Sequence, residues 1–153
     1  GVMVSLKVNG KPYTLEVAEN ETLVEVLRYR LGFMGVKEGC GEGDCGLCIV
    51  LMNGRPVHSC LVLAWRADGA EIVTVEGIGT ESSLHPVQRA FIDEGAVQCG
   101  FCIPAAVLIG KWALDKGLAK DREKIRWAYR GLLCRCGSYI RFEESVVRAA
   151  EGE

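Results

Sequence analysis

The residues of this 153-residue chain with the clearest capacity for chemistry are its 8 cysteines, which fall into two groups of four. The first group consists of Cys40, Cys45, Cys48 and Cys60, and the second consists of Cys99, Cys102, Cys134 and Cys136. Four thiolates brought together can hold a tetrahedral zinc ion or an iron–sulfur cluster. Since each half of the chain carries its own four, the spacing predicts two separate metal sites.

The first group has the spacing of a plant-type [2Fe-2S] site. Four residues separate Cys40 from Cys45, two separate Cys45 from Cys48, and Cys60 follows at a distance. Glycines recur through the same loop, and glycine permits the unusual dihedral angles and close approach that a backbone wrapped around a cluster needs. Structural zinc sites more often use two short cysteine pairs. We therefore interpret this group as the ligands of a [2Fe-2S] cluster.

The second group is less diagnostic by itself. Cys99 and Cys102 precede a helix expected to begin near Pro104, whereas Cys134 and Cys136 follow another expected helix. Helix ends that meet at one end of a helical domain can bring four thiolates together. The spacing alone leaves both a zinc ion and an iron–sulfur cluster open.

Two other interpretations of these motifs are weaker. Eight cysteines allow 105 disulfide pairings, but disulfide-dense scaffolds are usually small and secreted, and no export signal is visible at residues 1–7. Residues 41–46 match the Gly-x-Gly-x-x-Gly dinucleotide fingerprint. That fingerprint requires a strand before it and a helix after it, whereas this segment follows a helix and precedes a hairpin, so we interpret the match as accidental.

The elements expected to position the first group form a small α+β domain. Alternating apolar residues on both sides of Asn9-Gly10 predict a β-hairpin over 2–17. A helix should follow, with Asn20 as its N-cap and Gly32 at its end. The other elements expected here are a hairpin over 49–59, a short helix over 61–66 and a strand over 72–75.

The pattern after residue 80 is helical only. Helices are expected to begin at Pro86, at Pro104 and after a capping Asp121, and a fourth should cover 142–150. Four short amphipathic helices joined by tight turns are typical of a bundle. We therefore divide the chain into an α+β domain over 1–80 and a helical domain over 81–153.

Composition excludes several classes of function. The formal net charge of −2 argues against a general nucleic-acid-binding protein. The longest apolar stretch, 103–109, is too short to span a membrane. With no visible leader sequence, we expect a cytoplasmic protein.

Four stretches of the sequence resemble the two-cluster iron–sulfur subunit of the xanthine oxidase family of molybdenum hydroxylases. They are Gly35-Val36-Lys37-Glu38-Gly39-Cys40-Gly41-Glu42-Gly43-Asp44-Cys45-Gly46, Ser59-Cys60-Leu61, Gln98-Cys99-Gly100-Phe101-Cys102 and Leu133-Cys134-Arg135-Cys136-Gly137. The resemblance implies an N-terminal plant-type ferredoxin-like (β-grasp) domain and a C-terminal four-helix bundle, each holding a [2Fe-2S] cluster. Two segments depart from the family pattern: Ile103-Pro104-Ala105 stands for Thr-Pro-Gly, and Gly137-Ser138-Tyr139 stands for Thr-Gly-Tyr.

The resemblance also implies a place in a larger enzyme. A partner chain would hold a molybdenum–pterin cofactor, and a second would hold FAD, in a heterotrimer or a dimer of heterotrimers. Single electrons would pass from molybdenum to the second cysteine group, then to the first, and on to FAD. Gln98 and Cys136 match family positions that lie against the pterin. The chain itself would bear no substrate-binding catalytic site.

Two rival functions remain open at this point. A free-standing two-cluster ferredoxin would carry the same eight ligands without obligate partners, and a zinc-binding interaction module would contain no iron.

The histidines and tryptophans of the chain favour neither rival function. We expect His58 to be a partly exposed hairpin residue and His85 to help define a helix start, while Trp65, Trp112 and Trp127 should serve in packing.

Overall fold

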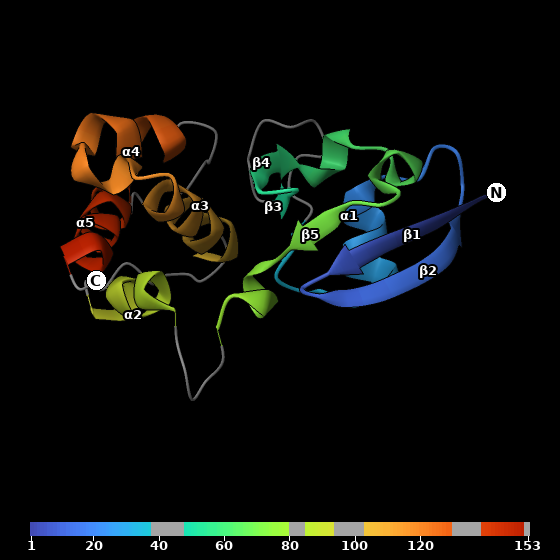
Figure 1. Cartoon of the computed structure of the whole chain (residues 1–153), viewed down its shortest axis with the longest axis horizontal. Helices are drawn as coiled ribbons and strands as arrows, with labels where there is room; N and C mark the ends of the chain where they lie inside the picture. Colours follow the sequence, from blue (N-terminus) through green and yellow to red (C-terminus); the bar gives the residue numbers. More distant parts are fainter. Residues whose placement is uncertain (38–47, 80–84, 94–102, 130–138, 152–153) are drawn as a thin grey trace.

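The computed structural model describes residues 1–37, 48–79, 85–93, 103–129 and 139–151. A mixed sheet with its helix forms one part of the molecule, and a group of helices lies beside it (Figure 1). This arrangement confirms the predicted α+β class. In the described residues, no helix has both the length and the apolar character needed to cross a membrane.

The sheet has five strands in the order β2-β1-β5-β3-β4. Their bounds are Val2–Val8 (β1), Lys11–Val17 (β2), Ile49–Met52 (β3), Arg55–His58 (β4) and Glu71–Val73 (β5). Strand β1 pairs with β5 in parallel, and the other pairs are antiparallel. The N-terminal hairpin and the β3–β4 hairpin are therefore joined through the short strand β5, and β4 lies at an edge.

Both predicted hairpins are confirmed, and their turns have the expected cause. Asn9 and Gly10 have φ angles of 54° and 83°, and Asn53 and Gly54 have 52° and 81°. Two consecutive positive φ angles define the turn that matches the twist of a two-residue hairpin, and Asn-Gly tolerates them best. The alternation in β1 buries one face of the strand against the core.

The first helix begins two residues later than predicted. It consists of α1, Leu23–Glu25, and a π-helical segment, Val26–Arg30. Its N-cap is Thr22 rather than Asn20: Glu25 donates its backbone N–H to Thr22 Oγ1, and the Glu25 carboxylate accepts from the Thr22 N–H at 3.2 Å. This reciprocal capping box satisfies two amide groups. Gly32 ends the helix with φ 80°, as predicted.

The expected helix over 61–66 is wrong. Two 3₁₀ turns, Ser59–Leu61 and Ala64–Ala67, stand in its place, and Val62 and Leu63 between them are extended. The cause is tertiary: Val62 O accepts a hydrogen bond from Leu23 N at 2.7 Å, and Leu63 forms a β-bridge with Thr22. The last strand is also shorter than expected, and a 3₁₀ turn, Val75–Gly77, follows it.

Four helices were predicted after residue 80, and four occur in the described part. They are α2 (Pro86–Asp93), α3 (Ile103–Asp115), α4 (Arg122–Tyr129) and α5 (Tyr139–Glu151), with a 3₁₀ turn, Leu118–Lys120, between α3 and α4. The predicted caps are confirmed. Asp121 Oδ1 accepts from Glu123 N at 2.9 Å, and His85 Nδ1 accepts from Val87 N at 3.1 Å.

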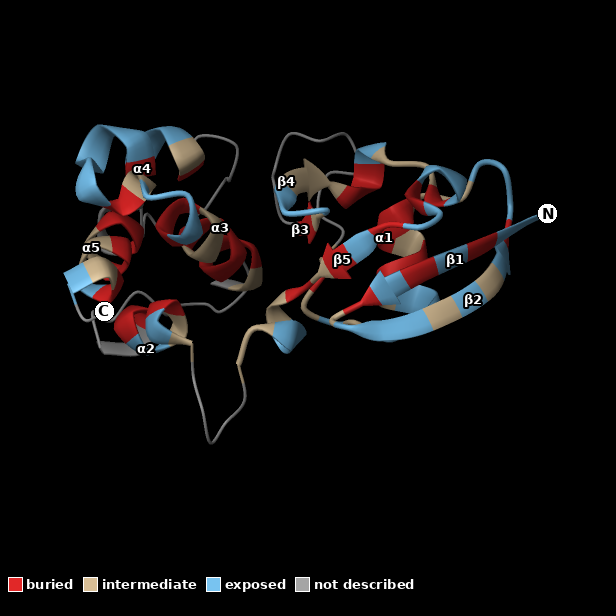
Figure 2. Ribbon diagram, in the orientation of Figure 1, coloured by how far each residue is buried: buried red, intermediate tan, exposed pale blue. Residues whose placement is uncertain are grey.

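Two apolar cores stabilise the two parts of the molecule (Figure 2). One lies between the sheet and the first helix. The other lies among α2 to α5, where the rings of Phe91 and Phe142 stack 5.4 Å apart. Ile49 of β3 belongs to this second core, with Val75 and Ile78 packed against it. Ile49, a strand residue of the N-terminal part, therefore packs against the helices and joins the sheet to them.

Candidate iron–sulfur sites

The β3–β4 hairpin brings two of the predicted ligands together. Cys48 directly precedes β3, and Cys60 lies two residues beyond the end of β4. The register pairs Ile49 with His58, so Cys48 lies opposite Ser59. Both thiol-bearing residues are buried, with exposed fractions of 1% for Cys48 and 9% for Cys60.

Ser59 holds this pair of cysteines in place. Its N–H donates to Cys48 O at 3.3 Å, and its hydroxyl donates to the same oxygen at 2.6 Å. Ser59 is itself fully buried, so both bonds are shielded from water. Leu61, by contrast, is 63% exposed. The buried Cys60 is therefore followed directly by a residue exposed at the molecular surface.

The chain leading toward Cys40 is anchored by two charged side chains. Arg28 Nη1 donates to Met34 O at 2.8 Å and to Val36 O at 3.2 Å. Gly35 N donates to Glu76 Oε2 at 2.9 Å. A Cβ at Gly35 would lie within 2.7 Å of the Val75 and Glu76 side chains, so this position has no room for one. These contacts fix the backbone up to the start of the cysteine loop.

A buried tyrosine joins the helix ends that flank the second cysteine group. The Tyr129 hydroxyl donates to Ala106 O at 2.7 Å, which ties the last residue of α4 to the first turns of α3. Cys102 directly precedes α3, and Cys134 follows α4. Burial raises the pKa of Tyr129 well above its ordinary value of 10, because the phenolate would lose its hydration. The tyrosine therefore remains a neutral hydrogen-bond donor.

Ion pairs hold α5 against α4. Glu143 is 8% exposed and accepts two hydrogen bonds from Arg126, at 3.0 and 3.1 Å. Glu144 accepts from Arg122 at 2.5 Å, and this hydrogen bond lowers the pKa of the Glu144 carboxyl. In the sequence, Cys134 and Cys136 lie between α4 and α5. These ion pairs therefore join the two helices between which that cysteine pair occurs.

The donor chemistry of the described site fits a thiolate-ligated metal cluster. Cys48 and Cys60 are both buried, at the two ends of the β3–β4 hairpin, and cysteine thiolates are the usual ligands of such clusters. The other predicted ligands and Gln98 lie outside the described residues; the ligands are Cys40, Cys45, Cys99, Cys102, Cys134 and Cys136. For that reason no group of three or more metal-binding side chains occurs within the described part.

Several residues that shape these sites escaped the sequence analysis. Arg28 and Glu143 carry no motif, and Ser59, although it belongs to a motif stretch, was not assigned a role; the roles of all three depend on contacts that form only in the folded chain. Tyr129 follows Ile125 by four residues, the spacing of one helix face, but the sequence does not indicate the partner of its hydroxyl. A polar atom at the end of an otherwise apolar face was the available signal, since a buried hydroxyl needs a partner.

Two family models match the chain, one for each part. The model described as a 2Fe-2S iron-sulfur cluster binding domain matches residues 6–74. The model described as a [2Fe-2S] binding domain matches residues 74–147. Together they cover both cysteine groups.

Known proteins match over nearly the whole chain. The nicotinate dehydrogenase small FeS subunit of Eubacterium barkeri is 40% identical, over 98% of this chain and 96% of its own length. The xanthine dehydrogenase iron-sulfur-binding subunit of Escherichia coli O157:H7 is 42% identical, over 95% and 92%. The structure of quinoline 2-oxidoreductase from Pseudomonas putida 86 matches with a TM-score of 0.92 at 35% identity, over 99% of this chain and 94% of that chain.

Proposed function

Because this chain belongs to the two-cluster iron–sulfur subunits of the xanthine oxidase family of molybdenum hydroxylases, we propose that it relays single electrons between two partner chains. One partner would hold a molybdenum–pterin centre, and the other would hold FAD. The observation that carries the proposal is the burial of Cys48 and Cys60 at the ends of one hairpin, within the part matched by a 2Fe-2S domain.

The eight cysteines divide between the two sites. Cys40, Cys45, Cys48 and Cys60 would ligate one [2Fe-2S] cluster, and Cys99, Cys102, Cys134 and Cys136 would ligate the other. When bound, each cluster supplies one-electron redox chemistry, tuned by hydrogen bonds to its sulfur atoms and by solvent exposure. The chain contributes the ligands, their burial and the hydrogen bonds that hold the ligand-bearing segments.

The finer architecture follows the same proposal. We place the domain boundary near residue 80, with the domains over 1–80 and 81–153. Helices α2 to α5 would form the four-helix bundle that carries the second cluster, supported by their shared core and by the contact between Tyr129 and Ala106. The N-terminal part would be the plant-type ferredoxin-like domain, supported by its mixed sheet.

The second cluster would lie on the molybdenum side of the assembly. Gln98 and Cys136 are proposed to lie against the pterin, where Gln98 could donate a hydrogen bond from its amide. The exposed Leu61 beside Cys60 favours the first cluster as the exit toward FAD. The expected assembly is a heterotrimer or a dimer of heterotrimers, and its cytoplasmic location remains a prediction.

Native purification with metal, flavin and pterin analysis tests the proposal. The assembly should contain molybdenum, FAD and about four irons per copy of this chain, with two distinguishable EPR signals after reduction. Recovery of the iron-loaded chain alone, without molybdenum or flavin, would identify a free-standing ferredoxin instead. A colourless preparation containing zinc would identify an interaction module.

A further inference from the structure

The chain contains two Asn-Gly pairs, and both form the tips of hairpins. Asn9-Gly10 joins β1 to β2, and Asn53-Gly54 joins β3 to β4. The sequences around them are closely matched, Val-Asn-Gly-Lys-Pro for the first and Met-Asn-Gly-Arg-Pro for the second. An Asn followed by Gly is prone to spontaneous deamidation, because glycine has no Cβ to obstruct its own nitrogen. The two pairs should therefore differ in reactivity only through the structure around each.

Deamidation at such a pair needs only the chain and water. The glycine nitrogen attacks Cγ of the preceding Asn, the bond between Cγ and Nδ2 breaks, and the side-chain nitrogen leaves as ammonia with the proton of the glycine N–H. The cyclic succinimide then adds a water molecule at either carbonyl, which gives aspartate or isoaspartate. A Cβ at Gly10 or Gly54 would meet no atom within 4 Å, so neither glycine is obstructed. The attack requires the Asn amide to leave its hydrogen-bond partners, so those partners set the rate through local opening.

The side-chain amide of Asn9 is held at both of its polar atoms. Asn9 Nδ2 donates to Thr74 Oγ1 at 2.9 Å, and Asn9 Oδ1 accepts from Thr74 N at 2.9 Å. Thr74 is fully buried. A Cβ at Gly77 would collide with the Asn9 side chain, so the amide packs directly against the backbone of Gly77. The Asn9 amide is therefore fixed in a position from which it cannot turn toward Gly10.

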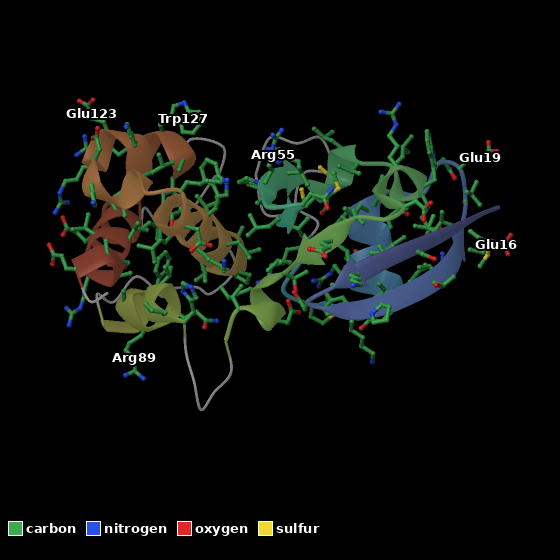
Figure 3. The ribbon with its side chains drawn as sticks, in the orientation of Figure 1. Glu16, Glu19, Arg55, Arg89, Glu123 and Trp127 are labelled. Atoms are coloured by element: carbon green, nitrogen blue, oxygen red, sulfur yellow. The ribbon has the colours of Figure 1, made fainter. Side chains whose placement is uncertain are left out.

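The side-chain amide of Asn53 is held more loosely and is exposed. Its Oδ1 accepts from Glu71 N at 2.9 Å, and among the described residues its Nδ2 has no acceptor. Arg55, the residue after this turn, extends its side chain away from the ribbon of β4 (Figure 3). The backbone N–H of each Asn donates to β5, at 2.9 Å for Asn9 and 2.8 Å for Asn53, so the two turns differ in their amides rather than in their backbones.

We propose that Asn53 deamidates in the folded chain and that the isoaspartate formed there loosens the hairpin between Cys48 and Cys60. Isoaspartate routes the backbone through the former side chain, which adds a carbon atom to the turn. A two-residue turn sets the register of its strands, and β3 and β4 have only 4 residues each. The effect on the hairpin rests on the proposed function, because it assumes that Cys48 and Cys60 bind a cluster.

Peptide mapping by mass spectrometry tests the site, after incubation of the full-length, iron-loaded chain at mildly alkaline pH. Asn53 should deamidate about fivefold faster than Asn9 or more, since Asn9 has one additional side-chain hydrogen bond to break. In urea the two rates should be equal, because the flanking sequences match. Asn20, which is followed by Glu21, is the internal control and should react slowest in both conditions.

Thr74→Val tests whether hydrogen bonding protects Asn9. The substitution removes the hydroxyl that accepts from Asn9 Nδ2 and keeps the shape of the side chain. Asn9 should then deamidate about fivefold faster than in the unchanged chain, whereas the rate at Asn53 should stay the same. An unchanged rate at Asn9 would show that its hydrogen bonds do not govern the reaction.

Iron release to a chelator tests the effect on the hairpin. The incubated chain should show a fast phase, about fivefold faster than the unmodified chain, whose amplitude equals the isoaspartate fraction found by enzymatic methylation. Asn53→Asp is the matched control: it adds the same charge without lengthening the backbone, and its carboxylate can still accept from Glu71 N. It should release iron as the unchanged chain does.

Two results would overturn the deamidation site itself. One is an Asn53 that stays intact in the folded chain while both pairs react in urea, and the other is an equal rate at Asn9 and Asn53 in the folded chain. Iron release from the incubated chain that is no faster than from Asn53→Asp would overturn the effect on the hairpin. Mass spectrometry does not depend on the clusters, so failure of the electron-transfer proposal would leave the first measurement decisive.

Discussion

Ser59 shows how one small side chain can position two reactive ones. Its N–H and hydroxyl both bind Cys48 O, and its own neighbour in the chain is Cys60. The hydroxyl bond is buried, and without it Cys48 O would keep only the longer bond from the Ser59 N–H. The backbone of Cys48 is thus held to the segment that carries Cys60 by a residue that is not a predicted metal ligand.

Cys48→Ser should remove the first cluster and spare the second. The serine oxygen is a poor ligand for a cluster held by thiolates, so the iron content should fall from about four to about two per chain. One of the two EPR signals should disappear on reduction. Cys99→Ser is the reciprocal variant and should remove the other signal. Loss of both signals in Cys48→Ser would contradict independent sites.

Arg28→Met tests whether the anchor before Cys40 supports the first cluster. Removing the hydrogen bonds to Met34 O and Val36 O should make release of iron from that cluster to a chelator about tenfold faster, equivalent to about 1.4 kcal/mol. The EPR signal of the first cluster should change shape, whereas that of the second should not.

Arg30→Met is the matched control for that variant. Arg30 lies on the same helical segment, but it donates to Glu16 O and to Glu21, away from the cysteine loop. It should leave both EPR signals and the rate of iron release unchanged. An equal effect of the two substitutions would assign Arg28 a general role in helix stability.

At the scale of the element, close packing joins α3 to α2 and α4. A Cβ at Gly110 of α3 would lie 2.9 Å from both Tyr129 Oη and Val87 Cγ1, so glycine allows α3 to approach α2 and α4 closely. The same approach lets Tyr129 reach Ala106 O. The start of α3, which follows Cys102, and the end of α4, which precedes Cys134, are therefore held together by helix packing and by one hydrogen bond.

The buried Tyr129 predicts a loss of stability at alkaline pH. Its folded-state pKa is raised by burial, so the folded chain keeps the neutral phenol while the unfolded chain ionises near pH 10. The contribution of the neutral, buried Tyr129 to the free energy of unfolding is fully present below pH 10 and is lost as the pH rises above it. Denaturant titrations at pH 8 to 11 measure this slope.

Tyr129→Phe should reduce the alkaline slope, because phenylalanine has no ionisable group. At neutral pH it should lower the free energy of unfolding by about 1 kcal/mol, the usual value of a hydrogen bond. Ultraviolet absorbance should show one tyrosine of the unchanged chain ionising only on unfolding. Its ionisation in the folded protein near pH 10 would contradict the prediction.

At the scale of the whole molecule, β3 serves both parts at once. Val50 is fully buried in the core of the sheet, whereas Ile49, its neighbour, is 6% exposed and packs into the helical core. Successive strand residues point to opposite faces, so one strand can supply both cores. A groove between β4 and helices α3 and α4 lies along the same junction.

Ile49→Ala and Val50→Ala should separate the stabilities of the two parts. Truncating Ile49 should destabilise the helical part by about 2–5 kcal/mol and lower its melting transition. Truncating Val50 should mainly lower the transition of the sheet. Scanning calorimetry of both variants measures the two transitions, with iron content as a check on the clusters. Equal shifts in both variants would show that the chain unfolds as one cooperative unit.

The sequence by itself determined the features that depend on local geometry. Asn-Gly at 9–10 and 53–54 predicted two hairpins because few other residues accept consecutive positive φ angles. Proline and capping residues marked the starts of α2, α3 and α4 for similarly local reasons. Cysteine spacing indicated two sites, since short separations such as Cys45 to Cys48 and Cys134 to Cys136 keep those residues close in space whatever the fold.

Only the tertiary structure decided what depends on distant contacts. Thr22 rather than Asn20 caps α1 because its bridge to Leu63 holds it at the helix start, and the same pairing keeps 62–63 extended instead of helical. Likewise, nothing local directs Tyr129 to Ala106 O or Ile49 into the helical core. These choices arise when two elements pack, because packing selects among conformations that the local sequence leaves nearly equal in free energy.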